Sequence, residues 1–347
     1  MKKSLTLFLF CFTALYSHAQ QTQIKGFFDS QLALVDSSSI GKKSHGFAIG
    51  ELNLFITSQI NDKTSFLAES VFAWDDDKQN FRIDVERVII RYSVSNLLNL
   101  ASGKFHTPFG YWSNAFHHGT LIQPTIVRPN IIRFEDEGGF LPIHQVGLQL
   151  DGSGFTNSNL GYNLFISNGQ AQGNSGGDFK QTGSVAISGA VNAEPIPNLK
   201  LIVSAFSNNV PAGSVTYQGI RLQENSNYTM LNATIAYFYG DLPIEFNAEY
   251  YSITNTMNVS GTSKLNGFFG YIGLKKFKLK PYLVYNSIQY QQNQSEQYFI
   301  KNNLTGFTAG LRYNIDPKAV VKLEYTNEKT DLTNTQKILR LQVAIGF

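Results

Sequence analysis

The chain has 347 residues, with 28 Lys and Arg against 25 Asp and Glu and a formal net charge of +3. This near balance of charge argues against a nucleic-acid partner, because nucleic-acid-binding proteins carry a strongly basic face. A mean hydropathy of −0.15, and no mature stretch as long as a spanning helix, exclude a helical membrane protein.

The N-terminus predicts export. Lys2 and Lys3 precede an apolar run over 5–16, and Ala19 follows as a small residue at the expected cleavage point. This is the three-part pattern of a secretory signal peptide over 1–19, which leaves 20–347 as the mature chain. Cys11 lies within the apolar run, so the mature chain has no cysteine and no disulfide framework.

The mature chain then alternates between strand and turn signals. Sixteen strands are predicted, at 24–35, 46–60, 64–74, 81–92, 97–105, 144–151, 159–168, 182–192, 199–207, 228–239, 244–254, 265–275, 279–290, 303–314, 319–327 and 337–347. An even number puts both termini on one side, as in the single-chain barrels of bacterial outer membranes.

The connections between these strands also differ in length. Short turns are expected at 61–63, 93–96, 194–198, 240–243 and 315–318. The intervening links are mostly longer and more polar, at 36–45, 75–80, 106–143, 169–181, 208–227, 255–264, 291–302 and 328–336. Short turns on one side and long loops on the other are typical of a membrane barrel.

The residue pattern within strands indicates two different environments. In 244–251, Ile244 and Phe246 alternate with Glu245, Asn247 and Glu249. Charged groups at successive inward positions are costly in a dry core and ordinary in a water-filled lumen, while the apolar face contacts lipid. The sequence therefore predicts an all-β fold: one sixteen-stranded antiparallel transmembrane β-barrel in the outer membrane of a Gram-negative type bacterium.

Two strands refine this prediction. The last one places apolar residues at every second position from Leu339 to Phe347, as expected of a strand that closes the barrel against the first. In 81–92, Val88 and Ile90 face outward if Arg87 points inward, and the same alternation would leave Glu86 facing lipid unless the strand bulges there.

The segment 103–152 encloses the longest connection, and its motifs carry a resemblance. They are Gly103-Lys104-Phe105, Thr107-Pro108-Phe109-Gly110, Arg128-Pro129, Glu135-Asp136-Glu137 before Gly138, Leu141-Pro142, and Gln145-Val146-Gly147-Leu148-Gln149-Leu150. In these residues the chain resembles the phosphate-selective porin family, called porins O and P. The resemblance implies a channel, commonly a homotrimer, whose third loop (here 106–143) folds into the lumen as a constriction.

The candidate pore residues follow from the predicted inward faces and from this loop. The wall candidates are Arg87, Arg91, Arg312, Lys322, Arg340, Glu51, Glu69, Glu245, Glu249 and Glu324. The constriction candidates are Arg128, Arg133, Glu135, Asp136 and Glu137. A lumen of mixed sign orients polar solutes and does not by itself select an anion. The alternative role for the loop charges is salt bridging that fixes the loop to the wall.

The sequence gives only weak indications of metal binding or enzymatic activity. Four histidines, His106, His117, His118 and His144, fall in or beside the loop, but no Cys supports them and their spacing matches no zinc pattern. We therefore expect polar loop residues, with no metal and no cofactor. No nucleophile with an oriented base is recognisable, so no enzyme is predicted.

The predicted function is an outer-membrane porin for passive diffusion of small polar or ionic solutes, including anions such as phosphate, with outer-membrane lipid as its surroundings. One alternative is a barrel with a closed lumen that acts as an adhesin or structural protein. Another is a secreted soluble all-β binding protein.

Overall fold

The computed structural model describes residues 21–37, 42–75, 80–169, 185–216, 219–275, 278–291, 302–331 and 334–347. The predicted signal peptide, 1–19, lies outside these residues. No helix in the described ranges is long and apolar enough to cross a membrane.

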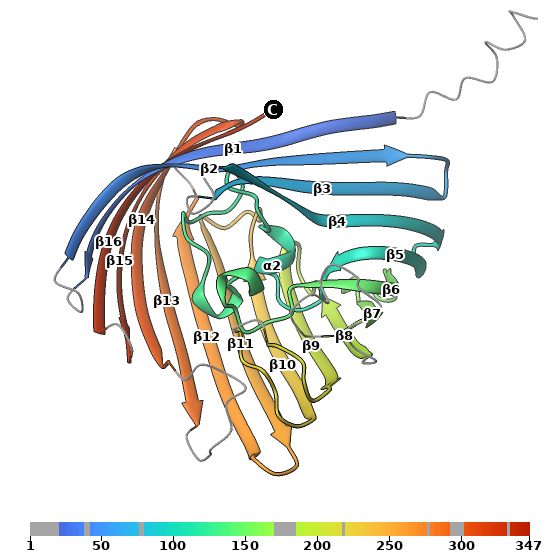
Figure 1. The fold of residues 1–347 in the computed structure, drawn as a ribbon. Coiled ribbons are helices and arrows are strands. Elements are labelled where there is room, and N and C mark those ends of the chain that lie inside the picture. The colour runs from blue at the N-terminus through green and yellow to red at the C-terminus, as the bar shows by residue number, and fades with distance from the viewer. Residues whose placement is uncertain are drawn as a thin grey trace, which may run out of the picture.

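The described chain forms one closed antiparallel sheet of sixteen strands (Figure 1). The strands are β1 Gln21–Ser37, β2 Lys42–Gln59, β3 Thr64–Asp75, β4 Asn80–Ser95, β5 Leu98–His106, β6 His144–Ser153, β7 Gly161–Ser167, β8 Ala186–Ala193, β9 Leu199–Val210, β10 Ser226–Tyr237, β11 Ile244–Met257, β12 Gly261–Leu274, β13 Leu279–Gln291, β14 Leu304–Asp316, β15 Ala319–Thr330 and β16 Asn334–Gly346. Each strand pairs with its sequence neighbours, which confirms the predicted fold class and strand count.

Several predicted loops are shorter than expected because the strands continue past the apolar pattern. β1 and β2 remain paired as far as Ser37 and Lys42, within the predicted 36–45 loop. β11 and β12 likewise pair out to Met257 and Gly261, within the predicted 255–264 loop. A hydrogen-bonded ladder continues as long as both strands supply partners, whether or not the side chains alternate.

The first and last strands close the barrel, as predicted. The backbone groups of Gly26 and Phe347 exchange two hydrogen bonds of 3.0 Å each. On β16, Leu341 is 39% exposed on the outer face, whereas the neighbouring Gln342 is 2% exposed and points inward. The apolar alternation at the C-terminus therefore separates the outer face from the interior, and the sheet has no free edge at this seam.

The conflict at Glu86 is resolved by a bulge. Arg87 pairs with Glu69, but the next pair is Val85 with Ser70, so Glu86 is an extra residue on β4. Val85 and Val88 both stay on the exposed outer face, and Glu86 turns inward with an exposed fraction of only 4%. The extra residue restores an apolar outer face on both sides of the acid.

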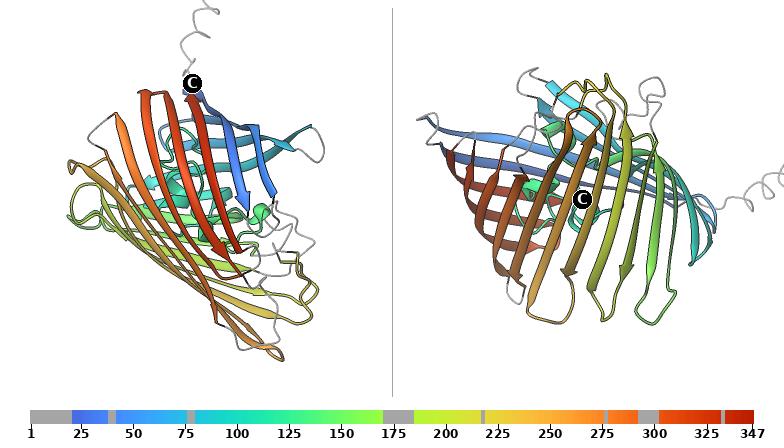
Figure 2. Two further views of the ribbon diagram at one scale, coloured as in Figure 1. Left: turned by 90° about the vertical axis from the view of Figure 1, so that its left-hand side faces the viewer. Right: turned by 90° about the horizontal axis from the view of Figure 1, so that it is seen from below.

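The connection between β5 and β6 lies within the barrel and carries helix α2, Trp112–Ala115, and the 3-10 turns η1 Asn130–Ile132 and η2 Glu135–Glu137 (Figures 1 and 2). We call residues 107–143 the interior loop. Its buried apolar side chains include Phe109, Trp112, Phe116, Ile131, Ile132 and Leu141. They form one cluster with inward residues of the wall, among them Tyr228 of β10, Tyr251 of β11 and Phe269 of β12.

The interior is therefore not uniformly wet. Along β10 to β13 the inward positions include aromatic and aliphatic residues as well as polar ones, and the interior loop packs against the apolar ones as a dry core. Glu249 of β11 and Lys322 of β15, which the alternation pattern predicts to face water, are also fully buried. Buried charges of this kind need polar partners, and the interior loop provides them.

Candidate functional site

The two ends of the interior loop are fixed to each other. β5 ends at His106 and β6 begins at His144, and these two residues pair across the sheet. Just beyond them, the Thr107 hydroxyl donates to the Pro142 carbonyl at 2.5 Å, and the Thr107 N–H donates to the Ile143 carbonyl at 2.8 Å. The loop thus leaves and rejoins the wall at one point.

Glu249 of β11 holds the start of helix α2. Its Oε1 accepts the backbone N–H groups of Tyr111 at 2.9 Å and Trp112 at 2.8 Å. These are the donors that the first turn of a helix leaves without intrahelical partners. Gly110 allows this close approach, because its φ is +70° and a Cβ there would lie 2.2 Å from Glu249 Oε2. The wall therefore supplies the cap that the sequence of this short helix lacks.

Three further wall residues hold the middle of the interior loop. Glu324 of β15 accepts the Ile126 N–H at 2.9 Å. Lys322, also on β15, donates to the carbonyls of Thr120 at 2.6 Å and Thr125 at 3.0 Å. Arg312 of β14 donates to two more loop carbonyls, those of residues 121 and 123, at 2.8 Å each. These predicted wall residues are thus bonded to the loop backbone.

The other predicted wall charges lie inside the barrel, mostly in pairs. Arg87 contacts Glu69 at 2.5 Å, and Arg91 contacts Asp151 at 2.8 Å. Glu245 accepts the Tyr271 hydroxyl at 2.6 Å. Arg340 of β16 interacts electrostatically with two acids of the neighbouring strand β15, Glu324 and Glu328.

Within the described residues, a cavity of about 530 Å³ lies between the interior loop and the wall formed by β1, β2, β3 and β16. We call it the side cavity. The wall side includes Asp29, Gln31, Gly50, Glu51, Trp74 and Gln342. The loop side includes His118, Thr120, Gln123, Arg128, Arg133, Phe134 and Glu137. Four of the predicted site residues, Glu51, Arg128, Arg133 and Glu137, therefore meet at one place.

The two arginines of the side cavity are held differently. The Arg128 guanidinium lies 4.0 Å from the centre of the Phe134 ring and donates to Ser113 Oγ at 3.1 Å and to the Ile132 carbonyl. Burial lowers the pKa of Arg128 to about 10. Arg133 is exposed and donates to Asn130 Oδ1 at 2.7 Å. Arg128 therefore also shapes the loop, whereas Arg133 presents its charge to the open space.

Of the remaining constriction candidates, Glu135 does not line the side cavity. Glu135 turns to the base of the loop, where its Oε1 accepts the backbone N–H of His144 at 2.9 Å. It lines a smaller neighbouring cavity of about 160 Å³ together with Glu137. The side chain of Asp136 lies outside the described part of the structure.

Asp29 is a site residue that the sequence prediction missed. It is fully buried on β1, where its carboxylate accepts the Glu51 N–H at 3.0 Å and the side-chain amides of Gln31 and Gln342 at 2.9 Å each. The pairing of β1 with β2 shifts register at this residue, so simple alternation does not place it. The residue type alone could have indicated its position, because an aspartate in a strand with an apolar outer face is stable only when its side chain points into the barrel.

The histidines differ most from expectation. The sequence predicts polar loop residues, but His106, His117 and His144 are buried together at the base of the interior loop. His118 lies beside them, with Nδ1 2.6 Å from Glu51 Oε2. Burial disfavours the charged form of His118, but the Glu51 carboxylate outweighs it and raises the pKa of His118 to about 10. Burial lowers the pKa of His117 well below its usual value.

Comparison with known proteins places the fold. No family model and no curated protein matches the sequence. Among solved structures, the chain is similar to the anion-selective porin from Comamonas acidovorans (12% identity over 94% of this chain and 100% of that one, TM-score 0.65). It is also similar to the trimer form of OmpT, an outer membrane protein of Vibrio cholerae (12% identity, 95% and 100%, TM-score 0.64).

A third similar structure is the outer membrane channel DcaP of Acinetobacter baumannii, with 11% identity over 94% of this chain and 97% of that one and a TM-score of 0.64. At such low identity these likenesses establish the fold alone. The chain has the closed all-β barrel architecture of outer-membrane proteins, and its resemblance to the phosphate-selective porins stays a prediction.

Proposed function

We propose that the protein is an outer-membrane porin through which small polar solutes and ions diffuse passively, without covalent chemistry. The observation that carries this proposal is the side cavity: the interior loop is bonded to wall residues of β11, β14 and β15, and it leaves a cavity beside β1, β2, β3 and β16. A loop held across a barrel narrows the lumen without needing to fill it.

The charges around this space support a broad solute class. Arg133, Arg128 and His118 stand on the loop side together with one acid, Glu137, and Asp29 and Glu51 stand on the wall side. Opposed charges create a field across the opening that orients dipolar solutes. Phosphate selection would require a run of cations along the pore, and the cations here are interleaved with acids. We therefore propose weak charge selectivity, with phosphate among the permeant anions.

The competing proposal is a barrel with a closed lumen and a structural or adhesive role. The dry core between the interior loop and β10 to β13 favours it, because that core already closes much of the interior. The two proposals differ in a single property, the permeability of the remaining space.

Proteoliposome swelling distinguishes them. The mature protein is refolded, reconstituted into liposomes and exposed to neutral sugars of increasing size. A porin gives swelling rates that fall from pentose to disaccharide. Folded, inserted protein that gives no swelling with any of these sugars would support the closed lumen.

We further propose a homotrimer, as the resemblance implies. The trimer form of the V. cholerae outer membrane protein OmpT supports this assembly for a barrel of this fold. Native mass spectrometry of the detergent-solubilised protein tests it, and a monomer mass alone would contradict it.

A further inference from the structure

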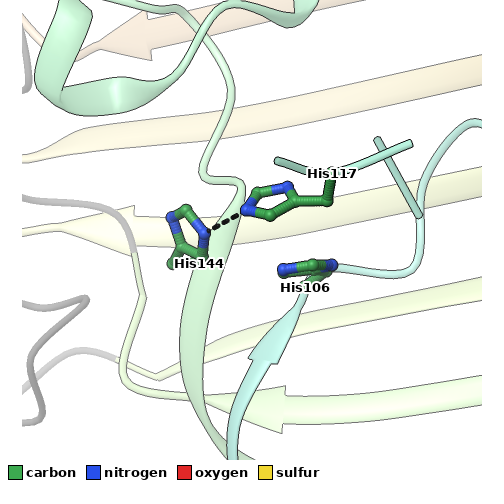
Figure 3. A group of neighbouring side chains, drawn as sticks. All are labelled: His106, His117 and His144. Carbon is green, nitrogen blue, oxygen red and sulfur yellow. Dashed lines mark hydrogen bonds between the residues drawn. The ribbon is translucent and has the colours of Figure 1, made fainter. Parts of the chain in front are cut away.

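A cluster of four ligand-type side chains closes the base of the interior loop. His106 ends β5, His144 begins β6, His117 follows helix α2 on the loop, and Glu86 is the bulged residue of β4. The three imidazoles face one another (Figure 3). All four residues are more than nine-tenths buried.

The donor atoms of this cluster converge. Nε2 of His117 lies 2.9 Å from Nε2 of His144, and both approach Glu86 Oε2, at 3.5 Å and 2.5 Å respectively. Each of the three histidines offers a ring nitrogen within 4.8 Å of those of the others. Ligand atoms around a tetrahedral zinc ion, with bonds of about 2.0–2.1 Å to nitrogen, are about 3.3 Å apart. The separations of 2.9 Å between His117 and His144 and of 3.5 Å between His117 and Glu86 are close to this spacing.

The surrounding residues orient the cluster in the way that metal sites require. His144 Nδ1 lies 2.9 Å from Glu135 Oε1, which leaves His144 Nε2 directed at the cluster. Glu86 Oε1 lies 3.5 Å from His118 Nε2, and His118 Nδ1 is held by Glu51. A carboxylate on the outer nitrogen of a metal-binding imidazole fixes the ring orientation and increases its basicity.

His106 provides an independent observation. Within the described residues neither of its ring nitrogens has a hydrogen-bond partner. The carboxylate oxygen Oε2 of Glu69 lies 4.0 Å from His106 Nε2, which is beyond hydrogen-bonding distance. Its ring lies against that of His117, with centroids 3.6 Å apart. A buried polar group without a partner costs free energy, and a bound ion would give the His106 imidazole the partner that it lacks among the described residues.

We propose that His117, His144 and Glu86 bind one divalent zinc-class ion, with His106 as the fourth ligand. Three imidazoles and one carboxylate form a donor set that suits Zn²⁺, and four protein ligands make the site structural. Bound there, the ion would connect β4, β5 and β6 to the loop beyond α2. This proposal does not depend on solute passage, because it concerns the base of the loop.

The test uses refolded mature protein that has been stripped with chelator and dialysed. Co²⁺ serves as the probe for visible absorption, and Zn²⁺ for calorimetry and for metal content after gel filtration. We expect one ion per chain, the absorption of four-coordinate Co²⁺, and displacement of Co²⁺ by Zn²⁺. Folding is checked for each variant by its heat-modifiable electrophoretic migration.

Single substitutions distinguish the proposed metal ligands from residues that do not bind the ion. His117→Ala and His144→Ala should abolish stoichiometric binding, and Glu135→Gln should weaken it about 10- to 100-fold. His45→Ala, an exposed histidine on β2, should bind as the wild type does. Since His106 makes no hydrogen bond in the described structure, His106→Ala should fold and lose the four-coordinate spectrum.

Two results would overturn the proposal. One is folded wild-type protein that takes up no stoichiometric Zn²⁺ or Co²⁺, which would leave the cluster as a proton-sharing network only. The other is undiminished binding by folded His106→Ala and His117→Ala proteins. Neither result would bear on swelling of proteoliposomes, so the porin proposal is tested separately.

Discussion

Glu249 is the residue on which the position of helix α2 depends. Replacing it with Ala removes the acceptor for two backbone N–H groups, and each lost charge-assisted hydrogen bond costs about 1.5–3 kcal/mol of docking free energy. We expect the interior loop of Glu249→Ala to release from β11, which raises single-channel conductance and exposes the loop to protease. Asp62→Ala, in the turn after β2, serves as the control. A loop that stays protease-resistant, with unchanged conductance, would show that the apolar core holds it unaided.

Arg133 is the residue best placed to set charge preference. It is exposed on the loop side of the side cavity, and its bond to Asn130 lies within the loop rather than with the wall. Arg133→Glu should shift the reversal potential in a KCl gradient toward cation preference. Lys63→Glu makes the same charge change in the β2–β3 turn and should leave the potential unchanged. Equal potentials for Arg133→Glu and wild type would remove the side cavity from the ion path.

Single residues also show what alternation can and cannot predict. Leu341 and Gln342 follow the two-residue period, so their faces were predictable from the sequence. Asp29 and Glu86 lie at register shifts, where one extra residue reverses the faces. The histidine cluster needs the antiparallel pairing of His106 with His144 and the return of the loop past Glu86, which no local pattern specifies.

At the scale of elements, the interior loop behaves as the core of the barrel. Trp112 is fully buried among aromatic wall residues, including Phe269 and Tyr271. Truncating a buried aromatic side chain to Ala costs about 3–5 kcal/mol. Trp112→Ala should therefore lower the temperature at which the folded barrel loses its heat-modifiable migration. Ile122→Ala, in the same loop but 40% exposed, should change it little. Equal losses for the two variants would contradict a docked loop.

The motif that carries the family resemblance has a structural explanation. Thr107 joins the two ends of the loop, Phe109 is buried in the core, and Gly110 makes room for Glu249. The family resemblance implied that the loop 106–143 folds into the lumen. Its partners could not be predicted, because polar wall residues such as Lys322 bond to loop carbonyls nearly two hundred positions away. Backbone groups carry no sequence signal of their own.

For the whole molecule, the proposed outer-membrane location requires an outer face that matches the bilayer. Leu341 lies in the middle of β16 with its side chain outward, whereas Ile315 lies at the end of β14 beside a turn. An outward Arg costs about 2–4 kcal/mol at the bilayer midplane and about 0–1 near the interfaces. Leu341→Arg should therefore reduce folding yield into lipid vesicles much more than Ile315→Arg. Equal yields would contradict this orientation of the barrel in a bilayer.

The most direct test of an open lumen is the conductance of single molecules of the refolded mature protein in a planar bilayer. A barrel whose interior loop leaves the side cavity open should insert in discrete, uniform steps of current. The mixed charges of that cavity should give a reversal potential close to zero in a KCl gradient. Insertion of folded protein without any current step would contradict the account and would assign the barrel a closed lumen.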